Sequence, residues 1–273
     1  SEAKIAKTDA VLLATIVAAQ AVILRAYVSA RTAEAPAPPL KLALFGWAAF
    51  GLGVLVKGPV ILLVCGATVF ALSLWDRDAR WLARLQTLRG LPVALLIVLP
   101  WLIAIGVASD GLFFQKSLGG DFAAKLVGEQ ETHGAPPGYY ALLMHATFWP
   151  ASFALLPGIV LGYLRRNEPA IRFLLVWACV TWIMFEITPT KLPHYILPAY
   201  PALAVLGALW MTGKGSESLA QRFARYVSYS LFVLVAATLA VFLLWAPTRF
   251  GGGTPTWWMY SAALGGAVAA LLV

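Results

Sequence analysis

Long apolar runs alternate with short polar connections along the whole chain. A bilayer core about 30 Å thick is crossed by roughly 20 helical residues, and nine apolar runs approach this length. They cover residues 10–24, 42–56, 60–75, 91–108, 140–164, 173–187, 195–211, 226–245 and 257–273. Trp and Tyr recur at the ends of the runs, as they do at membrane–water interfaces. We therefore predict an all-α fold, a polytopic transmembrane helix bundle of about nine spans.

Composition excludes an ordinary soluble domain. Hydrophobic residues make up 61% of the 273 positions, charged residues only 12%, and the mean hydropathy is +0.81. Soluble domains carry roughly 25% charged residues. Cys65 and Cys179 lie in apolar stretches without the spacing of a disulfide or metal framework, so we interpret them as small core residues. Because nothing marks off a soluble domain, residues 1–273 are expected to form a single transmembrane domain.

The net charge of +8 resides in alternate connections between the runs. One set holds 13 basic and five acidic residues, whereas the other holds seven of each when Glu186, near the end of the adjacent apolar run, is counted with it. The first set covers 25–41, 76–90, 165–172 and 212–225, and the second covers 1–9, 57–59, 109–139, 188–194 and 246–256. Basic residues accumulate on the cytoplasmic side of membrane proteins, so the second set is predicted to face outward. The charge thus indicates orientation, and no nucleic-acid partner is expected.

The long outward loop, residues 109–139, is predicted to carry an interfacial helix. Leu118, Phe122 and Leu126 fall on one helical face, with charged residues elsewhere. This pattern is typical of a helix that lies in the membrane surface. Such a helix would either line the entrance for a lipid-like ligand or merely cap the bundle.

Glycine and proline residues shape the remainder of this loop. It contains Glu129 and His133, which are four positions apart. Both are suitable ligands for a divalent cation and would share one if the stretch between them is helical, but a metal site needs further ligands. Solvated loop charges and contacts to substrate are the alternatives. The cofactor is therefore unknown, with a divalent metal ion as the one candidate.

Lys57 stands between two apolar runs, directly before Gly58 and Pro59. A lysine within the membrane costs about 2.5–3.5 kcal/mol on insertion scales, so it must extend to the interface or meet an anion. Gly-Pro is expected to open the next helix, whose N-terminal dipole favours an anion at the same place. This lysine and the N-terminus of that helix together would form a phosphate-binding site.

Four prolines within residues 189–201 predict a stiff, broken entry into the seventh run. Lys191, His194 and Tyr195 would thereby be presented at the outer membrane surface. A proline-kinked boundary with interfacial anchors explains any one of these polar residues. Three of them within five positions fit this explanation less well.

Lys7, Thr8 and Asp9 stand just outside the first run. A Thr-Asp pair before an apolar run is typical of a helix N-cap. Asp9 is therefore either a cap or a functional carboxylate.

Together, these motifs resemble the GT-C glycosyltransferases, in particular the bacterial branch of lipid A aminoarabinose transferases and protein O-mannosyltransferase-like enzymes. The resemblance covers roughly residues 1–212, and its most specific part is the Lys-Leu-Pro-His-Tyr-Ile-Leu-Pro segment at 191–198. The other motifs are Lys7-Thr8-Asp9-Ala10, Lys57-Gly58-Pro59, Pro137-Gly138-Tyr139-Tyr140, Trp149-Pro150 and Tyr200-Pro201-Ala202-Leu203-Ala204.

The resemblance implies that a sugar, a hexose or a pentose, moves from a polyprenyl-phosphate carrier to an acceptor such as lipid A, another glycan or protein. It also implies a multi-pass protein of the bacterial inner membrane, in contact with membrane lipids, with its active site facing the periplasm. Asp9 would be the catalytic residue and His133 the metal ligand. The residues expected to contact the carrier phosphate or the substrate are Lys57, Lys191, His194, Tyr195, Lys7 and Glu129.

The sequence also departs from this family. The first outward loop of the family, with its main acidic residue, would precede Ser1, and the chain stops at Val273 inside an apolar run. We therefore expect an internal or truncated segment that is inactive by itself. A transporter or flippase for an anionic lipid or sugar is the alternative function, although transporters place their ionisable residues near the bilayer midplane.

Overall fold

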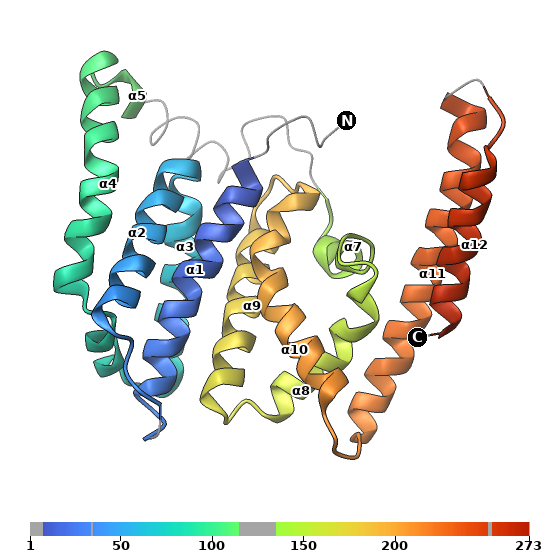
Figure 1. The fold of residues 1–273 in the computed structure, drawn as a ribbon, viewed down its shortest axis with the longest axis horizontal. Coiled ribbons are helices and arrows are strands. Elements are labelled where there is room, and N and C mark those ends of the chain that lie inside the picture. The colour runs from blue at the N-terminus through green and yellow to red at the C-terminus, as the bar shows by residue number, and fades with distance from the viewer. Residues whose placement is uncertain (1–7, 34, 115–134, 251–252, 273) are drawn as a thin grey trace. The chain divides into compact units, whose positions relative to one another are not determined.

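The computed structural model describes residues 8–33, 35–114, 135–250 and 253–272. Within these residues every regular element is a helix, so the all-α prediction is confirmed (Figure 1). The elements are α1 (Thr8–Ser29), α2 (Leu40–Lys57), α3 (Pro59–Asp76), η2 (Arg80–Leu85), α4 (Thr87–Ala108), α5 (Leu112–Phe114), α7 (Tyr139–Thr147), η4 (Ala151–Ala154), α8 (Leu155–Leu164), α9 (Pro169–Ile187), η5 (Pro193–Ala199), α10 (Tyr200–Thr212), α11 (Leu219–Phe250) and α12 (Trp257–Leu272).

Seven helical segments in the described ranges are long and apolar enough to cross a membrane. They are α1, α2, α3, α4, α9, η5 together with α10, and α11. Each coincides with one of the predicted apolar runs. The prediction of a polytopic membrane protein is therefore confirmed.

Of the two other predicted runs, the one at 140–164 does not form a single span. Within residues 140–164, α7 ends at Thr147 and the chain turns before η4 and α8. Pro150 lies in this turn, and proline both lacks an N–H and clashes with the preceding turn of a helix. The run at 257–273 forms α12, a helix of 16 residues that continues to Leu272, the last described residue, so its crossing of the membrane stays a prediction.

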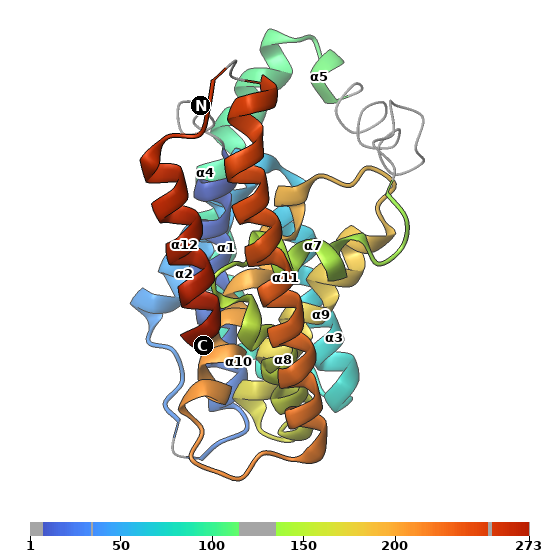
Figure 2. The same cartoon turned by 90° about the vertical axis from the view of Figure 1, so that its right-hand side faces the viewer.

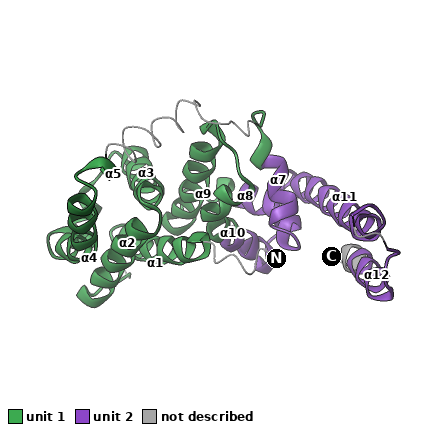
Figure 3. Cartoon of the chain, turned by 90° about the horizontal axis from the view of Figure 1, so that it is seen from above, with its two compact units in different colours: residues 1–140, 162–203 green, residues 141–161, 204–273 purple. Residues whose placement is uncertain are grey.

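The chain divides into two compact units (Figure 3). Unit 1 consists of Ser1–Tyr140 and Gly162–Leu203, and unit 2 of Ala141–Leu161 and Ala204–Val273. The expectation of a single domain over residues 1–273 stays a prediction.

In unit 1, α1 packs on α2, α2 on α4, and α3 on α9 (Figure 1). α1 and α9 are the most buried spans because other helices surround them, whereas α4 leaves most of its surface exposed. Close packing of α1 and α2 depends on Gly46, since an added Cβ there would lie 2.8 Å from Cβ of Val22. The interior of this unit therefore lies along α1 and α9.

A cluster of charged and aromatic groups, here called the inner lock, joins α1, α3 and α9 at one end of unit 1. Asp76, the last residue of α3, accepts a hydrogen bond from the Tyr27 hydroxyl at 2.7 Å and forms ion pairs with Arg31 at 2.5 Å and with Arg172. The Asp76 side chain is only 10% exposed. The inner lock lies at the end of unit 1 that carries the basic connections.

Unit 2 is built around α11. α12 runs beside α11 (Figure 2), and η4 packs against α11 as well. The Trp149 ring stacks on Phe232 with centroids 6.1 Å apart. α8 and α10 meet at two glycines, because a Cβ added to Gly158 would lie 2.7 Å from the backbone nitrogen of Gly207.

Candidate active site

The ends of α1, α2 and α3 bring the first two predicted site residues together. Asp9 lies in the first turn of α1, and Lys57 is the last residue of α2. Their side chains form an ion pair through Lys57 Nζ and Asp9 Oδ1. The carboxylate of Asp9 thus pairs with a side chain of another helix. The alternative, an N-cap, would involve only the backbone of α1 itself.

Gly58 and Pro59 produce the sharp reversal that places Lys57. Gly58 has a φ of 55°, a left-handed conformation that glycine adopts without strain, and its N–H bonds the carbonyl of Val54 at 2.8 Å. Pro59 is the first residue of α3, which suits its fixed φ and missing N–H. The prediction that Gly-Pro opens a helix beside Lys57 is confirmed.

The element η5 adds His194 and Tyr195 to this pair. His194 Nε2 lies 3.7 Å from Asp9 Oδ2, and the Tyr195 ring centroid lies 5.6 Å from Lys57 Nζ. The two rings pack edge to face with centroids 5.0 Å apart. Four residues that the sequence analysis singled out therefore form one cluster, called the outer cluster below.

A cavity of about 520 Å³ opens beside the outer cluster. Its polar part is formed by the four residues of the outer cluster together with Thr188, and the remaining wall is apolar. The apolar wall includes Leu12, Val60, Leu63, Phe185, Ile187 and Leu197. The cavity can therefore hold a ligand that carries an anionic or hydroxyl-rich head and a hydrocarbon tail.

Lys191 belongs to a different group of contacts and does not line this cavity. Its side chain is only 6% exposed, and its Nζ lies 3.2 Å from Glu186 Oε1. The same nitrogen donates to the carbonyl oxygens of Ala135 at 3.1 Å and Pro136 at 3.5 Å. The prediction that Lys191 is presented at the surface is wrong, because the amine is buried against a carboxylate.

Glu186 is the residue that sequence reasoning missed. It accepts hydrogen bonds from the backbone N–H groups of Gly138 at 2.9 Å and Tyr140 at 3.3 Å, and from the indole of Trp182 at 3.2 Å. The only signal was an acidic residue near the end of an apolar run. Together, Glu186 and Lys191 fasten residues 135–140 to the end of α9, and we call this group the loop clasp.

A further hydrogen bond supports the loop clasp. The buried Tyr140 hydroxyl donates to the carbonyl of Leu192 at 3.0 Å. Residue 192 is followed directly by η5, which carries the histidine and tyrosine of the outer cluster. The loop clasp therefore positions the beginning of η5.

Three predicted site residues, Lys7, Glu129 and His133, lie outside the described residues, as does the predicted interfacial helix. Within the described ranges, no group of three or more His, Cys, Asp or Glu side chains is arranged to hold a metal ion. The divalent metal ion and its candidate ligand His133 stay predictions.

Comparisons with known proteins relate the chain to one kind of enzyme. The chain is 30% identical over 210 residues to the undecaprenyl phosphate-alpha-4-amino-4-deoxy-L-arabinose arabinosyl transferase of Pseudomonas paraeruginosa, a match that covers 75% of this chain and 38% of that protein. The enzyme of the same name from Serratia proteamaculans is 32% identical over 164 residues, 59% of this chain and 29% of its own length. No protein-family model matches.

The fold is shared with ArnT from Cupriavidus metallidurans. Its crystal structure bound to undecaprenyl phosphate superposes with a TM-score of 0.73 at 21% identity, over 97% of this chain and 46% of that one. The chain thus spans less than half the length of the proteins that it matches. In sequence and in fold, the chain is related to the undecaprenyl phosphate-aminoarabinose transferases, and the resemblance to GT-C glycosyltransferases is confirmed.

Proposed function

We propose that the protein transfers a sugar from a polyprenyl-phosphate carrier to an acceptor outside the cytoplasm. The observation that carries this proposal is the cavity in which a lysine, a carboxylate, a histidine and a tyrosine meet an apolar wall. A polyprenyl-phosphate sugar has matching parts, namely an anionic phosphate, a hydroxyl-rich sugar and a hydrocarbon tail. The relatives are named for undecaprenyl phosphate-linked aminoarabinose, so this donor, with lipid A as acceptor, is the first to test.

The outer cluster supplies the groups that this reaction requires. The acceptor hydroxyl oxygen attacks the anomeric carbon, the bond from this carbon to the phosphate oxygen breaks, and the electron pair leaves with the carrier phosphate. Lys57 and the N-terminus of α3 stabilise the negative charge on this phosphate. Asp9 accepts the proton of the attacking hydroxyl as general base.

His194 and Tyr195 complete the proposed donor site. His194 lies beside the Asp9 carboxylate and holds it toward the cavity. Tyr195 places an aromatic ring near the Lys57 amine, where its hydroxyl is available to the phosphate or the sugar. In the absence of donor, Asp9 neutralises Lys57; an incoming phosphate takes over that role and releases the carboxylate.

We further propose that the protein resides in the bacterial inner membrane with the outer cluster facing the periplasm. The outer cluster and the inner lock lie at opposite ends of α1 and α3. Basic connections accompany the inner lock, and basic connections favour the cytoplasm. The ionisable groups therefore lie at the boundary of the spans, which favours surface chemistry over transport through the midplane.

A reconstituted transfer assay tests this proposal. The complete protein, purified in lipid nanodiscs, is incubated with undecaprenyl phosphate-linked aminoarabinose and lipid A, and mass spectrometry measures addition of the sugar to lipid A. Lys57→Gln is expected to lower the turnover rate by about 10²-fold, because one stabilising group for the leaving phosphate is lost. Asp9→Asn is expected to lower it at least as much.

Two matched substitutions serve as controls. Lys214→Gln removes an exposed lysine outside the cavity, and Asp110→Asn removes an exposed carboxylate beyond the end of α4. Both variants should retain full transfer. Full transfer by Lys57→Gln and Asp9→Asn would show that these residues do not form the active site. Transport of a lipid or sugar without any glycosylated product would refute the proposed transfer reaction.

A further inference from the structure

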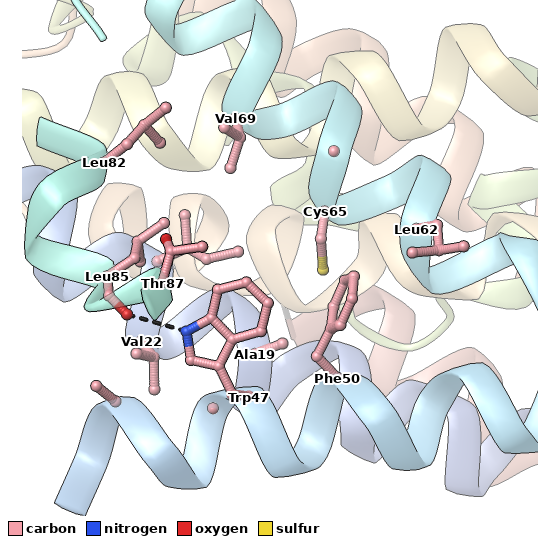
Figure 4. Close-up of a pocket in the computed structure, with 14 residues that line it drawn as sticks. Ala19, Val22, Trp47, Phe50, Leu62, Cys65, Val69, Leu82, Leu85 and Thr87 are labelled. Carbon is pink, nitrogen blue, oxygen red and sulfur yellow. Dashed lines mark hydrogen bonds between the residues drawn. The ribbon is translucent and has the colours of Figure 1, made fainter. Parts of the chain in front are cut away.

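A second cavity, of about 360 Å³, lies in unit 1 among α1, α2, α3, η2 and the start of α4. Figure 4 shows the Trp47 indole between Leu85 and Phe50, with Cys65 on the adjacent helix. None of the residues that line this cavity lines the cavity of the outer cluster. The sugar transfer proposed above leaves this second cavity without a role.

The second cavity has a buried floor and an open side. Val22, Ala43 and Cys65 on the floor are at most 4% exposed, whereas Leu62 at the side is 46% exposed. The Trp47 indole donates a hydrogen bond to the Leu85 carbonyl at 2.9 Å and so holds η2 against α2 (Figure 4). The cavity is therefore a fixed groove that opens sideways from the helices.

The residues that line the second cavity favour a hydrocarbon ligand. No charged side chain is among the lining residues, and nearly all of them are aliphatic, aromatic or glycine. At about 30 Å³ for each small group, the volume holds on the order of ten methylene groups. A hydrocarbon chain of this length fills the groove, and a sugar or a nucleotide would leave its polar groups unpaired there.

Two arginines near the inner end of the groove lack described partners. Arg84 lies on η2 between the lining residues Leu82 and Leu85, and Arg89 lies in the first turn of α4, close to Thr87. Neither arginine forms an ion pair among the described residues. Both belong to the basic connections that we assign to the cytoplasmic side, where anionic lipid headgroups collect.

We propose that the groove binds one acyl chain of an anionic phospholipid from the cytoplasmic leaflet, with the headgroup beside Arg84 and Arg89. The hydrocarbon lining and the sideways opening fit the acyl chain, and the two arginines, which form no ion pair among the described residues, fit the anionic headgroup. The site is separate from the donor site, and its test does not require transfer activity.

Photo-cross-linking tests the position of the acyl chain. The complete protein is reconstituted in nanodiscs with phosphatidylglycerol that carries a diazirine on one acyl chain, and mass spectrometry of peptides locates the cross-links. Labelling is expected on the peptides that contain residues 62–69 and 82–87.

Gly66 offers a way to fill the groove without a clash. It lines the groove, and an added Cβ there meets no atom within 4 Å, so Gly66→Leu should abolish labelling of both peptides. Gly265→Leu is the matched control, because this glycine is equally open but lies on α12; labelling should persist. Unchanged labelling in Gly66→Leu, with the protein folded, would overturn the proposal.

The headgroup is tested separately by competition. Each of Arg84→Gln and Arg89→Gln should reduce the preference for phosphatidylglycerol over phosphatidylcholine by about fivefold, the effect of roughly 1 kcal/mol per basic residue. An unchanged preference would overturn the assignment of the headgroup. Loss of labelling on addition of undecaprenyl phosphate, but not of unlabelled phosphatidylglycerol, would show that the groove holds the carrier tail instead, which also contradicts the proposal.

Discussion

Removing one charge of the Lys191–Glu186 ion pair at a time should show whether Lys191 stabilises the fold. Its side chain is only 6% exposed, and Glu186 is its charged partner. Glu186→Gln keeps the shape but leaves the ammonium buried without a counter-charge, a change that costs about 3–5 kcal/mol. For domains of about 150–250 residues, each 1 kcal/mol lowers Tm by about 2–4 °C. A loss of about 3 kcal/mol should therefore lower Tm by about 6–12 °C.

The reverse substitution should be milder. In Lys191→Met, the Glu186 carboxylate keeps the N–H donors of Gly138, Tyr140 and Trp182, and backbone donors alone stabilise a carboxylate well. We expect a loss of about 1.5 kcal/mol, the contribution of one hydrogen bond to a charged group. The double variant should lose less than the sum of the single variants, since neither charge is then left alone.

The measurement is thermal unfolding of the purified complete protein in one detergent, with Lys214→Met as the control for loss of an exposed lysine. Transfer activity is measured on the same samples at a temperature where all variants are folded. A Lys191→Met protein that is as stable as wild type but fails to bind undecaprenyl phosphate would refute the structural role. It would support the prediction that this lysine binds the carrier phosphate.

Two other predictions concern the packing of the helices. Asp76→Asn should destabilise the protein by about 3–5 kcal/mol, because two mostly buried arginines of the inner lock lose their shared carboxylate; Asp78→Asn, which removes a partner of an exposed arginine, should leave Tm unchanged. Gly158→Leu should prevent close contact of α8 with α10, since the first added atom already meets backbone at 2.7 Å, and should lower the yield of folded protein. Gly265→Leu should not, and equal yields would contradict this packing.

Hydropathy could locate the spans because the thickness of the bilayer fixes the length of a crossing helix. The same pattern could not show that residues 140–164 are broken. Pro92 and Pro100 lie inside the continuous helix α4, whereas Pro150 lies in a turn between two helices. Membrane helices tolerate proline where neighbouring groups satisfy the freed backbone, so the outcome depends on tertiary surroundings that a single sequence does not reveal.

The candidate site could be predicted only in part, for a similar reason. Asp9 and Lys57 were identified as outward-facing polar residues, but they are 48 positions apart, and their contact depends on how three helix ends meet. Lys191 precedes η5, whereas His194 lies in the first turn of η5, so no single helical period relates the directions of the two side chains. One of them consequently reaches Glu186 and the other reaches Asp9.

Binding of undecaprenyl phosphate to the complete protein in nanodiscs tests the outer cluster most directly. Titration should give an affinity for Lys57→Gln about 10- to 100-fold weaker than for wild type, the effect of one lost hydrogen bond to a charged group. Lys214→Gln should bind as tightly as wild type. Equal affinity of all three proteins would contradict the claim that Lys57 and the N-terminus of α3 bind the carrier phosphate.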